Sequence, residues 1–204
     1  SPAGGGKSGC FYQITSSLTA ADIPVLAFRL DRLEPVLSTV ALGAELDLAE
    51  SPALVLARAF PGRAVVLLID QLDFVSSTSG RHPDFFDTVA ALCDEVRGLR
   101  AGQSVHLILA CRQFDFENDF RFRRLLPPEE KPIKLEPFIA AEIRAVIQAA
   151  GGDPARLQPK QLELLGLAQN LALFVDSKLV LQNSTAFFTQ KQLFDEYWNV
   201  KKKE

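Results

Sequence analysis

The chain has 204 residues, of which 48% are hydrophobic and 23% are charged, a composition that argues against overall disorder. With 22 Lys and Arg against 25 Asp and Glu, the net charge of -3 gives no general attraction for nucleic acid or acidic membranes. The longest apolar runs, such as residues 64–69, are too short to span a membrane. Cys10, Cys93 and Cys111 have the spacing of neither a metal site nor a disulfide framework. We therefore expect a cytoplasmic globular protein.

Residues 1–8 form a glycine-rich segment that reads Ser1-Pro2-Ala3-Gly4-Gly5-Gly6-Lys7-Ser8. Glycines let successive backbone N–H groups converge on phosphate oxygens, a lysine at this place reaches the β- and γ-phosphates, and a serine hydroxyl can bind Mg²⁺. A predicted helix at residues 8–21 follows, and its N-terminal end favours a bound phosphate. We therefore predict a nucleotide-binding loop made of Pro2, Ala3, Gly4, Gly5, Gly6, Lys7, Ser8 and Gly9.

One position departs from the motif G-x-x-x-x-G-K-[ST], because Ser1 stands where the motif has glycine. A flexible glycine-rich linker is the alternative interpretation, although linkers seldom place Lys-Ser directly before an amphipathic helix. A phosphate loop also follows a strand. Since no strand precedes Ser1 and the sequence contains no methionine, we expect the first strand of the sheet to lie upstream of residue 1.

Short runs rich in leucine and β-branched residues recur along the next part of the chain. They lie at residues 25–30, 65–70 and 105–110, with a weaker run at residues 133–135. Predicted helices at residues 51–59 and 83–99 lie between them, and residues 76–80 form a predicted loop. Strands that alternate with helices are typical of βαβ units, so the pattern predicts an α/β fold with a parallel sheet between helices.

Two aspartates follow the apolar run at residues 65–70. Asp70 ends the run, and a carboxylate at this place can bind the Mg²⁺ that Ser8 also binds. Asp73 could orient or deprotonate the water that attacks the γ-phosphate. An Asp just beyond a strand can also serve as a helix N-cap, and this alternative stays open for Asp73.

The run at residues 105–110 is followed by Arg112. Ligands of open parallel sheets lie at the carboxyl ends of the strands, so this guanidinium is placed to meet the γ-phosphate as a nucleotide sensor. An arginine in a loop is otherwise often only solvated. With Arg112, the candidate site comprises Lys7, Asp73 and Arg112 for catalysis and Ser8 and Asp70 for the metal.

The pattern changes after Pro137, where apolar residues recur at spacings of three and four and no further β-rich run occurs. Gly151 and Gly152 end the first predicted helix of this part, and Thr189 precedes the last one. We therefore predict two domains. Residues 1–135 form the nucleotide-binding core, and residues 136–204 form a small all-helical lid.

Four segments in this order and spacing resemble the STAND class of ATPases, which are P-loop relatives of AAA+ proteins and of NACHT and NB-ARC switches. They are the phosphate loop and residues 68–73 (LIDQLD), 109–112 (LACR) and 135–138 (LEPF). The resemblance implies a P-loop NTPase core that binds Mg-ATP and hydrolyses it slowly, and so controls the conformation of a larger protein. It also implies flanking effector and sensor domains in the same polypeptide, and it is compatible with a homo-oligomer. The family commonly has a proline near the start of a lid helix, where this sequence has Ala168.

Two other features of the sequence are weaker indications of a functional site. Residues 114–125 interleave phenylalanines with three arginines, but three acidic residues balance them, so we expect this segment to pack beneath the neighbouring strand rather than bind single-stranded nucleic acid. One of its arginines could instead serve the nucleotide of a neighbouring subunit. His106 lies within a predicted strand, and we expect a buried histidine there rather than a ligand.

Two other functions compete with the switch ATPase. A DNA-associated AAA+ ATPase is disfavoured because the chain is acidic and has no basic lobe. A nucleotide-bound interaction module without turnover is suggested by Ser1 and Ala168. Guanine nucleotides are disfavoured because the sequence contains neither Asn-Lys-x-Asp nor Thr-Lys-x-Asp.

Overall fold

The computed structural model describes residues 4–99, 104–127, 130–176, 179–181 and 187–202. The chain divides into two compact units. The first holds the described part of Lys7–Lys134, and the second holds the described part of Leu135–Glu204 together with residues 4–6. The division after Lys134 lies beside the boundary predicted at residue 135.

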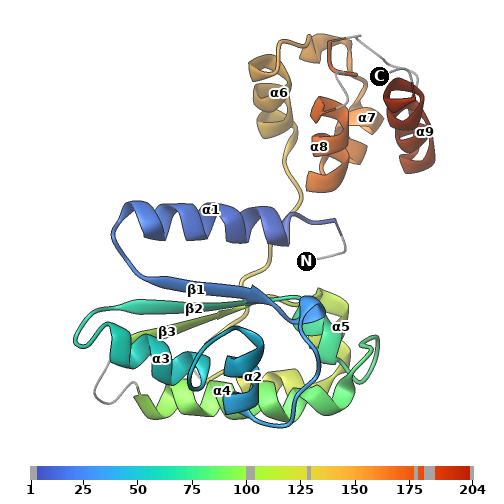
Figure 1. Cartoon of the computed structure of the whole chain (residues 1–204). Coiled ribbons are helices and arrows are strands. Elements are labelled where there is room, and N and C mark those ends of the chain that lie inside the picture. The colour runs from blue at the N-terminus through green and yellow to red at the C-terminus, as the bar shows by residue number, and fades with distance from the viewer. Residues whose placement is uncertain (1–3, 100–103, 128–129, 177–178, 182–186, 203–204) are drawn as a thin grey trace. The chain divides into compact units, whose positions relative to one another are not determined.

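The first unit contains a parallel sheet in the order β1-β2-β3 (Figure 1). Its strands are β1 (Val25–Arg29), β2 (Val65–Asp70) and β3 (Val105–Leu109). In the register of the sheet, Val66 of β2 lies opposite Val25 on one side and His106 on the other. The three stronger strand predictions are confirmed, and with them the α/β class and the parallel sheet.

Helices cover both faces of this sheet. Helix α1 (Lys7–Ala20) lies on one face, and α2 (Thr39–Glu45), α3 (Pro52–Ala59) and α4 (Phe86–Leu99) lie on the other (Figure 1). Serine N-caps begin two of them, because the side chains of Ser38 and Ser51 accept hydrogen bonds from the first turns of α2 and α3. The helices predicted at residues 8–21, 51–59 and 83–99 are confirmed. The third begins with a 3-10 turn.

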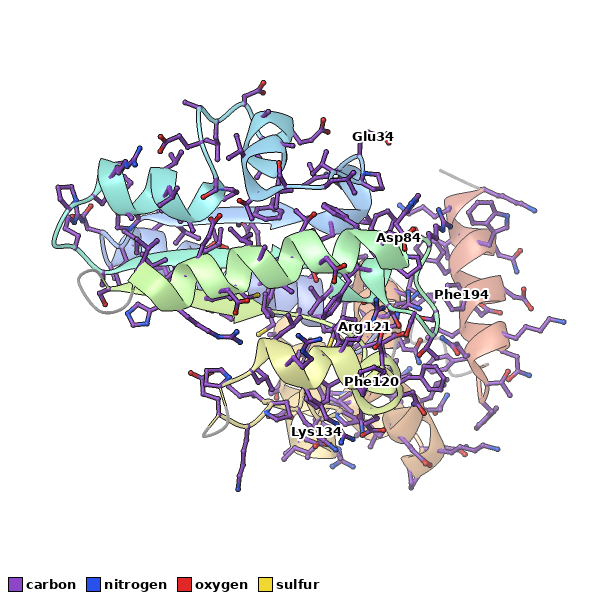
Figure 2. All side chains as sticks on the ribbon, turned by 90° about the horizontal axis from the view of Figure 1, so that it is seen from below. Glu34, Asp84, Phe120, Arg121, Lys134 and Phe194 are labelled. Atoms are coloured by element: carbon purple, nitrogen blue, oxygen red, sulfur yellow. The ribbon has the colours of Figure 1, made fainter. Side chains whose placement is uncertain are left out.

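Several shorter elements were not predicted, because a helix of one or two turns gives little periodic signal. They are α2, α5 (Gln113–Asn118) and the 3-10 helices Leu30–Arg32, Leu72–Val75 and Phe120–Leu125. The aromatic segment 114–125 therefore consists of most of α5 and the 3-10 helix Phe120–Leu125. Phe122 and Leu125 join the core, as expected, whereas Phe120, labelled in Figure 2, is 72% exposed.

The first core lies between the sheet and the helices α2–α4. Strand β2 is buried along its whole length, because it is the central strand and both of its faces are covered. Alternate residues Val65, Leu67 and Ile69 point into this core. On the other face α1 contributes no fully buried side chain.

Two expectations about strands are wrong. Residues 133–135 have irregular backbone, and Ile133 is 91% exposed; Pro132 and Pro137, which lack the N–H that a ladder needs, flank the run. His106 is exposed rather than buried, because the alternation of β3 turns it away from the face on which Val105 is buried. Its Nε2 lies 2.8 Å from the hydroxyl oxygen of Ser104.

The described residues of the second unit contain helices and no strand. The helices are α6 (Ala140–Ala149), α7 (Pro159–Leu165), α8 (Ala168–Asp176) and α9 (Gln190–Lys201), with a 3-10 turn at Pro154–Arg156. Their core includes Ile147, Leu165, Phe174 and Leu193. Thr189 caps α9 by accepting a hydrogen bond from the backbone of Gln192, as its place before the last predicted helix indicated.

No helix in the part of the chain that the structure describes is long and apolar enough to cross a membrane.

The central strand gives a stability prediction. Leu67→Ala should lower the free energy of unfolding by about 2–5 kcal/mol, because Leu67 is fully buried and its truncation leaves a cavity. The matched control is Leu37→Ala, at a side chain that is 91% exposed, for which we expect a change within about 0.5 kcal/mol. Urea unfolding followed by circular dichroism measures both. Equal effects of the two substitutions would contradict the core described here.

Candidate functional site

The contact at the centre of the candidate site joins two residues that are 62 positions apart in the sequence. The hydroxyl of Ser8, in the first turn of α1, donates a hydrogen bond to Oδ2 of Asp70 at 2.9 Å. Asp70 is buried at the carboxyl end of β2. The two residues predicted to share a metal ion are therefore in direct contact.

The backbone beyond Asp70 turns sharply. Gln71 has a φ of +60°, a left-handed conformation that is uncommon for residues other than glycine, and its N–H donates to Oδ1 of Asp70 at 2.8 Å. The next N–H, that of Leu72, donates to the carbonyl oxygen of Ala110 at 2.9 Å. The pairing of β2 with β3 thus continues past the strands and brings the residues after each strand together.

Asp73 and Arg112 are the side chains that this pairing brings into contact. Nε of Arg112 lies 3.1 Å from Oδ2 of Asp73. The Asp73 side chain is 8% exposed, whereas that of Arg112 is 47% exposed. Oδ1 of Asp73 is buried and has no hydrogen-bond partner among the described residues. A buried carboxylate oxygen without a partner is costly, so this atom is a candidate to receive a ligand group.

The environment of Asp73 favours its protonated form. Burial raises the pKa of the Asp73 carboxyl, and the negative charge of Asp115 adds to this effect. The positive charges of Arg112 and Lys7 act in the opposite direction and lower the same pKa. Lys7 and Arg112 therefore both act electrostatically on Asp73.

The predicted phosphate loop is described from Gly4 onward, and Pro2 and Ala3 lie outside the described residues. Gly4 and Gly6 have φ values of +75° and +88°, which residues with a side chain rarely adopt. Gly4, Gly5 and Gly6 group with the second unit, where the N–H of Gln169 donates to the carbonyl oxygen of Gly4 at 3.0 Å.

The rest of the loop, from Lys7 to Gly9, belongs to α1 and to the first unit. Gly9 faces open space, since a Cβ added there would meet nothing within 4 Å. The structure thus gives a conformational reason for the glycines at positions 4 and 6 but none for the glycine at position 9.

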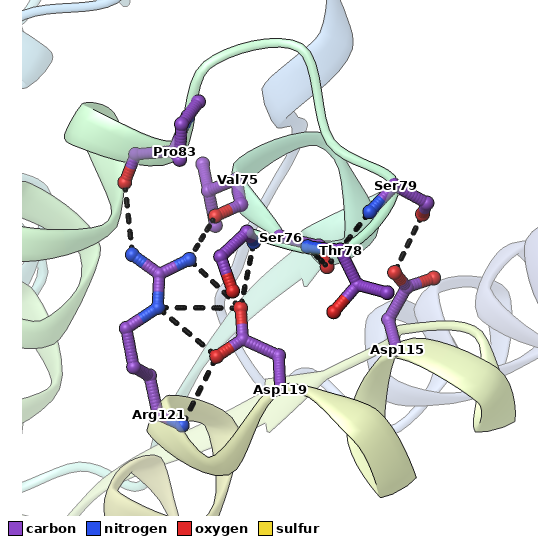
Figure 3. Close-up of polar contacts among 9 residues, drawn as sticks. Val75, Ser76, Thr78, Ser79, Pro83, Asp115, Asp119 and Arg121 are labelled. Atoms are coloured by element: carbon purple, nitrogen blue, oxygen red, sulfur yellow. Dashed lines mark hydrogen bonds and ion pairs between the residues drawn. The ribbon is translucent and has the colours of Figure 1, made fainter.

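Sequence reasoning missed Asp115, a fully buried residue of α5. Its Oδ1 accepts a hydrogen bond from the hydroxyl of Ser79 at 2.5 Å, and its Oδ2 has no partner among the described residues (Figure 3). The sequence does carry a signal, because Asp115 stands between two phenylalanines three residues after Arg112. The net charge of the segment does not reveal it, because three arginines balance the three acidic residues.

Sequence reasoning also missed the pairing of Asp119 with Arg121. Arg121 contacts both carboxylate oxygens of Asp119, and its guanidinium lies over the ring of Phe86, 4.5 Å from the ring centre. Arg121 lowers the pKa of the buried Asp119 carboxyl far below its usual range. This pair also contacts the loop that follows β2.

The donor set at Ser8 and Asp70 is compatible with a magnesium ion. Mg²⁺ prefers oxygen ligands and is commonly bound through one or two carboxylates together with the phosphates of a substrate. A serine hydroxyl beside a buried carboxylate fits this chemistry. Among the described residues, no group of three or more His, Cys, Asp and Glu side chains could hold a metal ion by itself.

Neither models of known protein families nor curated proteins match this chain. The case for a function therefore depends on the residues and the geometry described above.

The ion pair gives a prediction that needs no ligand. Arg112→Ala should raise the pKa of the Asp73 carboxyl further, because Arg112 is the strongest influence that lowers it. A ¹³C NMR titration of the aspartate carboxyl carbons measures the change. The matched control is Arg81→Ala, which removes the same charge from an exposed position in the loop after β2 and should leave Asp73 unchanged. An unchanged Asp73 titration in Arg112→Ala would rule out the ion pair in solution.

Proposed function

We propose that this chain is the nucleotide-binding module of a switch ATPase, which binds Mg-ATP and hydrolyses it slowly to control the conformation of a larger protein. The observation that carries the proposal is the 2.9 Å hydrogen bond between Ser8 and Asp70. It joins a serine that follows Gly-Lys at the start of a helix to a carboxylate at the end of a buried parallel strand. This pairing of residue types and elements is what a phosphate loop with its magnesium carboxylate requires.

The binding half of this function would depend on α1 and the residues before it. Backbone N–H groups of the glycine segment and the N-terminal end of α1 favour phosphate oxygens, and Lys7 adds a positive charge. Ser8 and Asp70 would hold the Mg²⁺. When bound, that ion would neutralise part of the charge that develops on the phosphate oxygens.

The hydrolytic half would depend on Asp73 and Arg112. Asp73 has a buried carboxylate oxygen without a partner, and its raised pKa makes it a better proton acceptor than an exposed aspartate. Arg112 is half-exposed and contacts Asp73 through Nε. A guanidinium carries further N–H donors, with which it could meet the γ-phosphate.

A module that binds nucleotide without turnover is the second candidate. The Asp73–Arg112 ion pair favours it, because an aspartate held by an arginine is less free to accept a proton from water. A DNA-associated ATPase gains no support, since the net charge is -3. Single-turnover hydrolysis of ATP separates the switch ATPase from the second candidate.

The binding step can be tested at Lys7. Lys7→Ala should weaken the binding of Mg-ATP by about ten- to a hundredfold, because a charge-assisted hydrogen bond to phosphate is lost. Isothermal titration calorimetry measures the affinity. The control Lys134→Ala removes a half-exposed lysine of the same unit, whose ion-pair partner is Glu117, and should bind Mg-ATP like the wild type. Equal affinities of Lys7→Ala and the control would refute the phosphate loop.

The chemical step can be tested at Asp73. Asp73→Asn should bind Mg-ATP almost normally and hydrolyse it about a hundredfold more slowly, because the amide cannot accept the proton of the attacking water. Asp84→Asn is the control, since Asp84 is exposed in the 3-10 turn Pro83–Phe85 and its substitution should leave the rate unchanged. Binding without measurable hydrolysis by the wild type would select the second candidate, and an unimpaired Asp73→Asn would remove Asp73 from the chemistry.

A further inference from the structure

The loop that follows β2, residues 76–82, is held by the segment that follows β3. Arg121 donates from Nη2 to the carbonyl oxygen of Val75 at 3.0 Å and from Nη1 to that of Pro83 at 3.1 Å (Figure 3). These two carbonyls stand at the beginning and the end of the loop. One guanidinium therefore ties both ends of the loop to the 3-10 helix Phe120–Leu125.

Asp119 completes this arrangement, which we call the Asp119–Arg121 clamp. Its Oδ2 accepts a hydrogen bond from Nη2 of Arg121 at 2.7 Å and another from the backbone N–H of Ser77, also at 2.7 Å. Its Oδ1 accepts from Nε of Arg121 at 3.0 Å. The carboxylate is buried and both of its oxygens are satisfied, so its position is strongly determined.

The clamp holds the turn that carries Asp73. Asp73 and Val75 belong to the same 3-10 helix, and the N–H of Ser76 donates to the carbonyl oxygen of Asp73 at 3.1 Å. The clamp binds the residues on either side of Ser76, namely the carbonyl of Val75 and the N–H of Ser77. A shift of this turn would therefore move Asp73.

The other side of the clamp is continuous with Arg112. Arg112 precedes α5, and Asp119 follows that helix directly, with its own N–H donating to the carbonyl oxygen of Asp115 at 2.8 Å. Asp115 adds a further attachment to the same loop through Ser79. The segments that carry Asp73 and Arg112 are thus joined at the strand ends and again at the clamp.

We propose that Asp119 and Arg121 are positioning residues for the ATPase reaction, which hold the backbone segments that carry Asp73 and Arg112 in place, so that both side chains can reach the bound nucleotide. This inference rests on the proposed function, and it assigns to the clamp no contact with the nucleotide. Stabilisation of the fold alone is a weaker explanation, because buried ion pairs often contribute little net stability whereas their fixed geometry can specify one arrangement. A small displacement of a reacting group is expensive, since about 1 Å can cost about a hundredfold in rate.

The test uses two conservative variants of the whole chain, Arg121→Lys and Asp119→Asn. Lysine keeps the charge but lacks the planar fork that reaches two carbonyls and a carboxylate, and asparagine keeps the shape of Asp119 but loses its charge. We expect kcat for ATP hydrolysis to fall by about ten- to a hundredfold in both variants. KM and the calorimetric affinity for Mg-ATP should stay close to the wild type, because Lys7, Ser8 and Asp70 are untouched.

Two controls separate positioning from stability. Arg63→Lys alters a second arginine that contacts a carboxylate and a backbone carbonyl, both of Asp22, but it lies before β2 at the amino ends of the strands. Val89→Ala removes a fully buried side chain of the core and lowers stability without touching the clamp. Both controls should keep the wild-type kcat at a temperature at which all variants are folded by circular dichroism.

The outcomes are distinct. A loss of kcat confined to the clamp variants, with KM preserved, supports the positioning role. Wild-type kcat in Arg121→Lys and Asp119→Asn overturns that role and leaves the proposed function intact. The same conclusion holds if kcat falls in Val89→Ala as much as in the clamp variants, because the fall then reflects lost stability. Absence of hydrolysis by the wild type overturns both. If one clamp variant does not fold, the other decides.

Discussion

The parallel pairing of β2 with β3 is the constraint on which the rest of the site depends. Parallel strands end at the same edge of a sheet, so the residues that follow them must meet there. The hydrogen bond from Leu72 to Ala110 extends this pairing beyond the strands and brings Asp73 to Arg112. Because β2 is buried on both faces, its end cannot shift without disturbing the core, and Asp70 is delivered to Ser8 by a rigid element.

Buried charges near the ends of the strands must be paired or hydrogen-bonded. Asp73, Asp115 and Asp119 are all buried close to the strand ends, and a buried carboxylate is costly unless it is paired or hydrogen-bonded. Asp119 is fully satisfied by Arg121 and Ser77, and its pKa is lowered. Asp73 and Asp115 each have one buried carboxylate oxygen without a partner among the described residues, and burial raises the pKa of Asp73. A carboxylate with a structural role needs hydrogen-bond partners for both oxygens. The combination of a missing partner and a raised pKa at Asp73 is instead typical of a group that acts on a ligand.

The sequence was most informative where apolar runs are continuous. Residues 65–70 are apolar up to the terminal Asp, so the strand and the place of its aspartate could both be predicted. Residues 133–135 could not be assigned correctly, since a run of three residues has little periodicity and whether it forms a strand depends on a partner. The contact of Asp73 with Arg112 was foreseeable as proximity at one sheet edge. The clamp could not be predicted, because Asp119 and Arg121 bind backbone atoms of residues 75–83. The pattern of side chains in a sequence does not indicate such backbone partners.

Under the proposed function, the Asp73–Arg112 ion pair is also the contact through which nucleotide binding would change the structure. A ligand shifts a conformational equilibrium only if it contacts the two states differently. Arg112 holds Asp73 through Nε. A γ-phosphate would compete with Asp73 for this guanidinium, whereas ADP has no group there. The segments that carry Arg112 and Asp73 both lead into the Asp119–Arg121 clamp, so such competition would be transmitted to the loop at residues 76–82. Under the proposed function, this loop, in which residues 77–79 and 81–82 are exposed, would be the part of the first unit best placed to present the nucleotide state to another domain.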